Sequence, residues 1–240
     1  MKQRLDLVLV ARGLAGSREK AQALIMAGSV MVQGQKAAKP GQTVEPDAEI
    51  AVAAPPRYVS RGGLKLEAAL HGFHVDPTGL ICIDIGASTG GFTDCLLQHG
   101  AKRVHAIDVG TNQLDYRLRT DLRVRSQEHR NARELKLDDI GELVELLVCD
   151  VSFISVTLIL PAMITLLAAG SRMIVLVKPQ FEVGKGQVGK GGIVRDPELH
   201  VSACARVEEA VRAAGFETAL MPSPILGTEG NKEFLLYGHH

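Results

Sequence analysis

A glycine-rich turn follows the apolar run 80–85 and leads into a predicted helix at 91–99. The turn reads Gly86-Ala87-Ser88-Thr89-Gly90-Gly91, and Phe92 follows it. Such a turn lets backbone N–H groups approach a ligand beside a helix N-terminus. The next predicted strand, 103–109, contains Asp108 near its end. A carboxylate there can accept hydrogen bonds from both hydroxyls of an adenosine ribose.

Two classes of cofactor fit this outline, the dinucleotides and S-adenosylmethionine. Ser88 stands where the dinucleotide fingerprint has the glycine that lets a pyrophosphate approach. Asp84 ends the strand before the turn, where a carboxylate suits a cationic aminoacyl group and repels phosphate. Both details favour S-adenosylmethionine, and the alternative is a tight turn used only for packing. The predicted cofactor-binding residues here are Asp84, Gly86, Ser88, Gly90, Gly91, Phe92 and Asp108.

Four charged residues stand near the ends or flanks of predicted apolar elements. They are Lys65, Asp150, Lys178 and Glu233. Asp150 and Lys178 each close a predicted strand, so both should open into the crevice above the carboxyl edge of a parallel sheet. Each residue alone could be a solvated charge or a salt bridge at the rim. Two charges that end adjacent apolar strands are harder to dismiss, because Lys and Asp are seldom buried without a partner.

Two lysines and two carboxylates form a suitable set for activating a hydroxyl. Methylation of a hydroxyl requires a base that takes the proton as the oxygen attacks the sulfonium methyl group in line. A lysine can act as this base only if its pKa falls, which a second nearby cation causes, and a carboxylate then holds one lysine in position. We therefore expect the set to activate a ribose 2′-hydroxyl without a metal ion.

Alternating strands and helices position these residues. After residue 63, predicted strands at 80–85, 103–109, 146–150 and 173–178 alternate with predicted helices, and strands at 216–221 and 233–237 close the chain. This alternation predicts an α/β fold, a Rossmann-like and mainly parallel sheet with helices on both faces. The uncharged run 151–171 is long enough to span a membrane. Its serine, threonine and proline residues favour a buried loop and crossover helix instead.

The composition is that of a soluble globular protein, with 46% hydrophobic and 22% charged residues. The four cysteines lie far apart and form no CxxC pair, so we expect buried reduced thiols rather than a zinc site or disulfides. The amino terminus lacks the apolar stretch of a signal peptide. The expected location is the cytoplasm, with no stable membrane association and no metal.

The charge is unevenly distributed along the chain. Residues 1–65 hold ten basic and five acidic residues, a net charge of +5, and the rest of the chain carries −5. A basic head suggests a module that binds a polyanion, although small domains are often basic by chance. We expect a small α+β domain at 1–54, a linker at 55–63 and the α/β domain at 64–240. The glycine-rich segment 179–196 could close over a phosphate backbone or be an exposed surface loop.

Three motifs of the sequence closely resemble the TlyA family, bacterial proteins known as haemolysins and as ribosomal RNA 2′-O-methyltransferases. The motifs lie at 58–66, 84–94 and 177–182. The large domain is similar to FtsJ-like methyltransferases, whose Lys-Asp-Lys-Glu set maps onto Lys65, Asp150, Lys178 and Glu233. The resemblance implies that Lys178 is the base and that Glu128 and Asn131 belong to an adenine pocket. The implied reaction is methyl transfer from S-adenosylmethionine to the ribose 2′-hydroxyl of cytidine in 16S or 23S rRNA, or both.

The basic head resembles an S-four-type RNA-binding domain in the spacing of its glycines and apolar residues. In that family a basic helical face binds structured RNA. The resemblance implies phosphate or ribose contacts from Arg4, Arg12, Arg18 and Lys20, with ribosomal RNA or ribosomal subunits as the partner. Two alternatives remain beside a methyltransferase. One is a membrane-active haemolysin-like protein, and the other is an RNA-binding protein that has lost catalysis.

Overall fold

The computed structural model describes residues 2–54, 56–227 and 229–240, apart from the side chain of Lys185. The chain forms two compact units, Met1–Arg57 and Tyr58–His240. The expected linker, 55–63, spans the division between them, and residue 55 lies outside the described residues.

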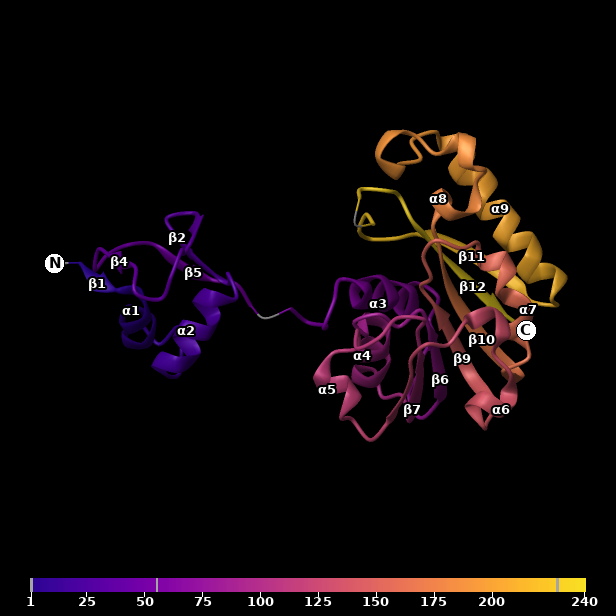
Figure 1. The fold of residues 1–240 in the computed structure, drawn as a ribbon, viewed down its shortest axis with the longest axis horizontal. Helices are drawn as coiled ribbons and strands as arrows, with labels where there is room; N and C mark the ends of the chain where they lie inside the picture. The colour runs from indigo at the N-terminus through magenta and orange to yellow at the C-terminus, as the bar shows by residue number, and fades with distance from the viewer. Residues whose placement is uncertain (1, 55, 228) are drawn as a thin grey trace. The chain divides into compact units, whose positions relative to one another are not determined.

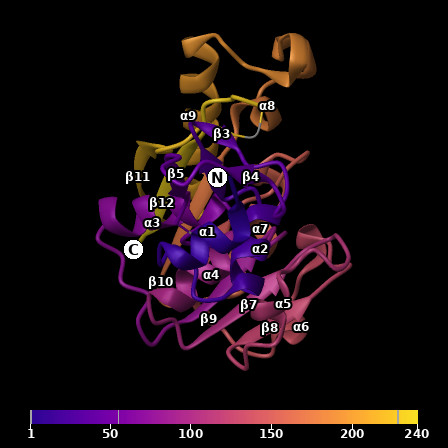
Figure 2. The same ribbon diagram turned by 90° about the vertical axis from the view of Figure 1, so that its left-hand side faces the viewer.

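The first unit packs two helices against short strands (Figure 2, indigo and violet). Its elements are β1 (Gln3–Arg4), α1 (Leu5–Ala11), α2 (Arg18–Met26), β2 (Val30–Val32), β3 (Gln35–Lys36), β4 (Thr43–Val44) and β5 (Ile50–Val52). The Ser17 hydroxyl accepts a hydrogen bond from the backbone N–H of Lys20 and so caps the amino end of α2. Leu5, Leu9 and Ile25 are buried between the helices and strands.

A seven-stranded sheet forms the centre of the second unit (Figure 1). Its strands are β6 (Ile81–Ile85), β7 (Arg103–Ile107), β8 (Val124–Gln127), β9 (Val144–Cys149), β10 (Leu167–Val177), β11 (Glu217–Pro222) and β12 (Phe234–His239). The spatial order is β11-β12-β10-β9-β6-β7-β8, and only β12 is antiparallel to its neighbours. The chain moves from β6 to β7 and β8 on one side and then to β9 and β10 on the other. The strand order therefore reverses at β6, which is where ligands bind in such sheets.

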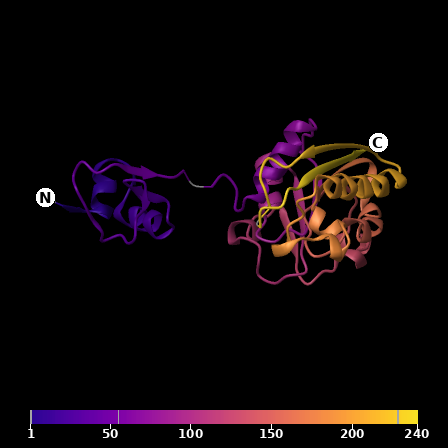
Figure 3. The ribbon, with the colours of Figure 1, turned by 90° about the horizontal axis from the view of Figure 1, so that it is seen from above.

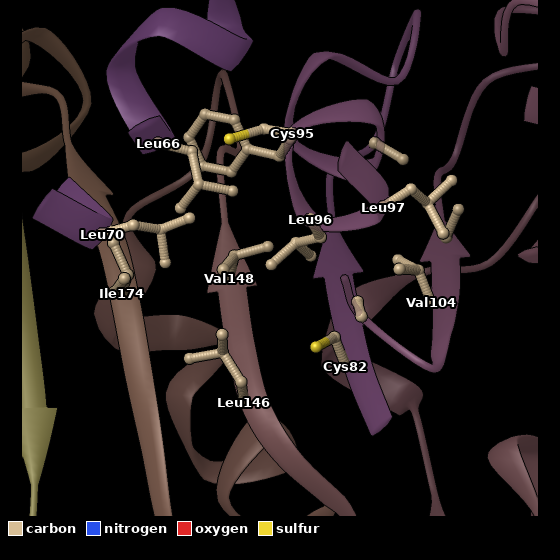
Figure 4. Close-up of a cluster of buried hydrophobic side chains, with 14 of the residues drawn as sticks. Leu66, Leu70, Cys82, Cys95, Leu96, Leu97, Val104, Leu146, Val148 and Ile174 are labelled. Carbon is tan, nitrogen blue, oxygen red and sulfur yellow. The ribbon is translucent and has the colours of Figure 1, made fainter. Parts of the chain in front are cut away.

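Helices cover both faces of the sheet, as predicted. On one face lie α3 (Gly62–Gly72) and α4 (Gly91–Gln98), and Figure 4 shows their leucines resting on side chains of the strands. On the other face lie α7 (Leu160–Ile164) and α9 (Pro197–Ala213), and Figure 3 shows α9, in orange, alongside the closing strands. Alternate residues of the inner strands β6, β9 and β10 supply the two apolar layers.

Two stretches differ from the sequence-based expectation. The polar stretch after β7 contains α5 (Tyr116–Arg119), the edge strand β8, a 3₁₀ turn at Ala132–Glu134 and α6 (Leu137–Ile140). The strand was missed because its central residues are polar and exposed. The uncharged run 151–171 forms a loop, a 3₁₀ turn at Val156–Leu158, α7 and the start of β10, so its crossover helix is much shorter than the run itself.

None of the helices in the described ranges is both long and apolar enough to cross a membrane. All four cysteines are buried, as predicted.

Leu66 should contribute strongly to stability, since it is fully buried between α3 and the sheet. We expect Leu66→Ala to lower the free energy of unfolding by about 2–5 kcal/mol. Leu64→Ala, on the same helix but 39% exposed, should cost less than about 1 kcal/mol. Urea denaturation of both variants measures the difference. Equal losses would contradict this packing of α3.

Candidate active site

The glycine-rich turn connects β6 to α4 with backbone geometry that favours glycine. Gly86 has φ +84°, and a Cβ on it would lie 2.5 Å from the backbone oxygen of Asp150. Gly91 packs against the residues before α3, since a Cβ there would lie 2.2 Å from Ser60 Oγ. Glycine at these two positions therefore lets the turn pack closely against the residues that follow β9 and those that precede α3.

Asp108, which follows β7, lies beside this turn. Its carboxylate accepts hydrogen bonds from the backbone N–H groups of Ser88 and Gly110, each at 2.7 Å. These bonds fix the carboxylate at the rim of the turn. Remaining lone pairs on both oxygens can accept further hydrogen bonds, as a ribose would require.

Asp84 lies fully buried at the end of β6. Its Oδ2 accepts hydrogen bonds from the backbone N–H and the hydroxyl of Thr93, at 2.9 and 2.7 Å. Its Oδ1 finds no hydrogen-bond donor among the described residues. Burial is the main cause that raises the pKa of Asp84 to about 7; the bonds from Thr93 oppose it, and the charge of Asp150 adds to it.

A first cavity of about 570 Å³ opens between the ends of β6, β7 and β9. Gly86, Ser88, Asp108 and Asn131 line it, as the cofactor prediction requires. Glu128 does not line this cavity as the described residues define it, and its Oε1 instead accepts a hydrogen bond from the backbone N–H of Asn112 at 2.8 Å. Of the two residues predicted for the adenine pocket, Asn131 therefore lines the cavity and Glu128 does not. The carboxylate of Glu128 holds the loop after β7 instead.

A second cavity of about 270 Å³ gathers the four predicted catalytic side chains, Lys65, Asp150, Lys178 and Glu233. Asp150 and Lys178 are the first residues past β9 and β10. Glu233 precedes β12, and the amino end of this antiparallel strand meets the same edge of the sheet. Lys65 lies in the first turns of α3.

The four side chains form two ion pairs. Lys65 Nζ lies 2.5 Å from Glu233 Oε2, and both side chains are buried. Lys178 Nζ lies 2.6 Å from Asp150 Oδ1 and donates a hydrogen bond to Ser152 Oγ at 2.9 Å. Removing charges from water is costly unless they are paired, so each pair holds its members in one arrangement.

The two cavities adjoin. Gly86, Ser88, Asp150 and Ser152 line both of them. A molecule bound over the glycine-rich turn in the first cavity would therefore lie next to the two lysines in the second. The arrangement suits group transfer between a bound donor and a substrate oxygen.

The remaining predicted cofactor residues take different places. Gly91 and Phe92 line the second cavity, whereas Gly90 caps α4 in a left-handed conformation with φ +94°. Asp84 lies behind the turn and lines neither cavity as the described residues define them. Its buried carboxyl group instead holds the start of α4 through the two hydrogen bonds from Thr93.

The predicted RNA contacts lie in the first unit, where three arginines also have a structural role. Arg4 and Arg18 both bind the buried carboxylate of Asp6, at 2.9 and 3.1 Å. Arg12 donates to the backbone oxygens of Pro46 and Ala48. Lys20 is exposed on α2.

Sequence reasoning missed several residues of the site. Ser152 binds Lys178, and Phe153, 92% exposed with φ +65°, lines the first cavity. Ser60 and Arg61 line the second. The aromatic Phe153, three residues after the predicted catalytic Asp150, was a signal in the sequence that could have indicated a site residue. Ser152 gave no such signal, because its partner Lys178 lies on another strand.

Among the described residues, Glu67, His71 and His99 could hold a metal ion, since their ligand atoms lie within 4.8 Å of one another. No member of this group belongs to the lining described for either cavity. The candidate active site is therefore separate from it.

The strand order, the glycine-rich turn after β6 and the carboxylate after β7 define the fold of S-adenosylmethionine-dependent methyltransferases. A solved structure from Listeria monocytogenes, provisionally named as such a methyltransferase, has the same fold with a TM-score of 0.56 at 12% identity; it covers 75% of this chain and 99% of its own. Residues 58–240 match the FtsJ-like methyltransferase family, and residues 3–50 match the S4 domain.

Relatives match almost the whole chain. The 16S/23S rRNA (cytidine-2′-O)-methyltransferase TlyA of Mycobacterium tuberculosis is 44% identical over 98% of this chain and 89% of its own length. Hemolysin A of Brachyspira hyodysenteriae is 44% identical over 98% of both. A Streptococcus thermophilus structure, provisionally named a hemolysin, is 46% identical with a TM-score of 0.76 and covers 99% of this chain and 88% of its own. The chain belongs to the FtsJ-like methyltransferases and, within them, to the TlyA family, which confirms the resemblance seen in its motifs.

The raised pKa of Asp84 predicts a specific dependence of stability on pH. The folded protein keeps this proton up to about pH 7, whereas the unfolded chain releases it near its ordinary value of 3.8. The free energy of unfolding should therefore fall as pH rises between these values, by up to about 1.4 kcal/mol per pH unit. Asp84→Asn should remove this fall, which urea denaturation at several pH values measures. Parallel curves for the two proteins would contradict the buried, protonated carboxyl.

Proposed function

We propose that this protein transfers a methyl group from S-adenosylmethionine to the ribose 2′-hydroxyl of a cytidine in ribosomal RNA. The observation that carries the proposal is the convergence of Lys65, Asp150, Lys178 and Glu233 on one cavity beside the glycine-rich turn. The names of TlyA relatives, which state this reaction, support the choice of substrate.

The residues of the first cavity fit S-adenosylmethionine. Asp84 Oδ1 is buried without a hydrogen-bond donor among the described residues, and a cationic ligand above the turn would favour the ionised form of this carboxyl group. Gly86 lines this cavity without a side chain, and Asp108 is fixed where it can accept from ribose hydroxyls. Ser88 and Asp84 both disfavour a pyrophosphate. When bound, S-adenosylmethionine supplies an electrophilic methyl group on a sulfonium.

Lys178 is the proton acceptor in this proposal. Its Nζ is fixed by Asp150 and Ser152, so the amine has one position from which to meet a hydroxyl in the second cavity. Lys178 must first release the proton that it carries in the ion pair; as the 2′-oxygen attacks, the neutral amine takes the hydroxyl proton and the ion pair with Asp150 forms again. Asp150, 2.6 Å away, stabilises that positive charge.

Lys65 and Glu233 orient the substrate opposite this pair. Glu233 fixes Lys65, and the Lys65 ammonium can donate to a ribose or phosphate oxygen at the cavity. Phe153 offers an exposed ring at the rim of the first cavity on which a base can stack. The first unit supplies basic residues for RNA outside the catalytic site.

Lys178→Ala should abolish methyl transfer while leaving RNA affinity nearly intact, because the substitution removes the base and little binding surface. Tritium transfer from labelled S-adenosylmethionine to ribosomal subunits measures the first quantity, and filter binding measures the second. Lys102→Ala is the matched control, since Lys102 is exposed just before the amino end of β7, at the opposite edge of the sheet. Substantial transfer by Lys178→Ala would remove Lys178 as the base.

Lys20→Glu should weaken RNA binding, and the loss should shrink as salt rises, because a contact to phosphate releases counterions. We expect the slope of log affinity against log salt to change by about one for the lost contact. Lys20 is preferable to Arg18 for this test, because Arg18 also binds the buried Asp6. Lys102→Glu, with the same change of charge, should leave affinity unchanged. Equal effects of the two substitutions would exclude Lys20 as an RNA contact.

A further inference from the structure

We propose that Glu182 is a positioning residue that fixes the loop after β9 against the loop after β10, and thereby aligns Asp150 and Ser152 with Lys178. The inference rests on the proposed function, in which Lys178 accepts the proton and Asp150 and Ser152 hold Lys178 in place. Glu182 lies outside both cavities as the described residues define them, so its effect must pass through the loops.

Glu182 bridges the two loops with both oxygens of its carboxylate. Oε2 accepts a hydrogen bond from Ser155 Oγ at 2.5 Å, and Oε1 accepts one from the backbone N–H of Val156 at 2.8 Å. Ser155 and Val156 begin the 3₁₀ turn that ends the loop after β9. Glu182 ends α8 (Pro179–Glu182), which starts immediately after Lys178.

The position of Glu182 is costly for a carboxylate. The residue is 3% exposed and sits at the carboxyl end of a helix, where the backbone dipole disfavours negative charge. Arg206 donates to the backbone oxygen of Glu182, and no ion pair joins a described cation to its carboxylate. The bonds to Ser155 and Val156 offset this cost, because each oxygen meets a separate donor.

The loop after β9, residues 150–156, is held at both of its ends. At its start the loop is fixed to the sheet by the backbone N–H of Asp150, which donates to Ile85 O at 2.9 Å. At its end the loop is fixed by Glu182. Between them Ser152 accepts from Lys178, and the rings of Phe153 and Phe181 lie 5.3 Å apart. Without Glu182, the end of the loop would lose both of these hydrogen bonds, and Ser152 would be held less firmly beside Lys178.

Glu182→Ala should lower kcat by about 10- to 100-fold, since a misplacement on the order of 1 Å at a reacting group has effects of this size. The KM values for S-adenosylmethionine and RNA should change by less than about threefold. Glu182→Gln should retain most of kcat, because its amide oxygen can accept from Val156 and the Ser155 hydroxyl can accept from its amide N–H. Amide hydrogen exchange of residues 151–156 should speed up in Glu182→Ala and not in Glu182→Gln.

Val207→Ala is the matched control, since Val207 is fully buried on α9 and contacts neither loop end by a hydrogen bond. It should lower the melting temperature as Glu182→Ala does, yet keep kcat at a temperature where both are folded by circular dichroism. Unchanged kcat or unchanged exchange in Glu182→Ala would overturn the proposal, and so would an equal loss of kcat in Val207→Ala. If the folded wild-type protein itself transfers no methyl group, the proposed function fails and this inference falls with it.

Discussion

Charges removed from water must be paired, and this requirement organises the site. Lys65 and Glu233 are 168 residues apart in the chain, yet their buried side chains meet at 2.5 Å. Lys178 and Asp150 come from neighbouring strands and meet at 2.6 Å. The first pair can exist only if α3 and β12 begin close together, and the second only if β9 and β10 end side by side. The fold and the candidate chemistry therefore depend on the same contacts.

The reversal of strand order at β6 supplies the other half of the arrangement. It leaves the glycine-rich turn exposed at the centre of the sheet, with Asp108 on one side and Asp150 on the other. Gly86 lies close to the backbone of Asp150, and these two residues line both cavities. A donor and an acceptor can thus be held side by side by one short stretch of backbone.

The sequence predicted those elements of the fold that a short run of neighbouring residues marks. Alternating apolar runs predicted the strands β6, β7, β9 and β10, and the glycine spacing predicted the turn. Strand β8 was missed because an edge strand with a polar centre has no apolar run to mark it. Ser152 and Glu182 were missed because their partners lie 26 and 27 residues away, on another strand or loop, so spacing alone does not reveal them.

The product nucleoside tests the central claim most directly. Wild-type protein, labelled S-adenosylmethionine and ribosomal subunits would be incubated together. The RNA would then be digested to nucleosides, and the nucleoside that carries the label would be identified by chromatography and mass spectrometry. We expect the label in 2′-O-methylcytidine, because the adjoining cavities would hold the methyl donor beside a ribose hydroxyl and the names of the TlyA relatives specify cytidine. Label on a base atom, or a folded protein that leaves the RNA unlabelled, would contradict the account.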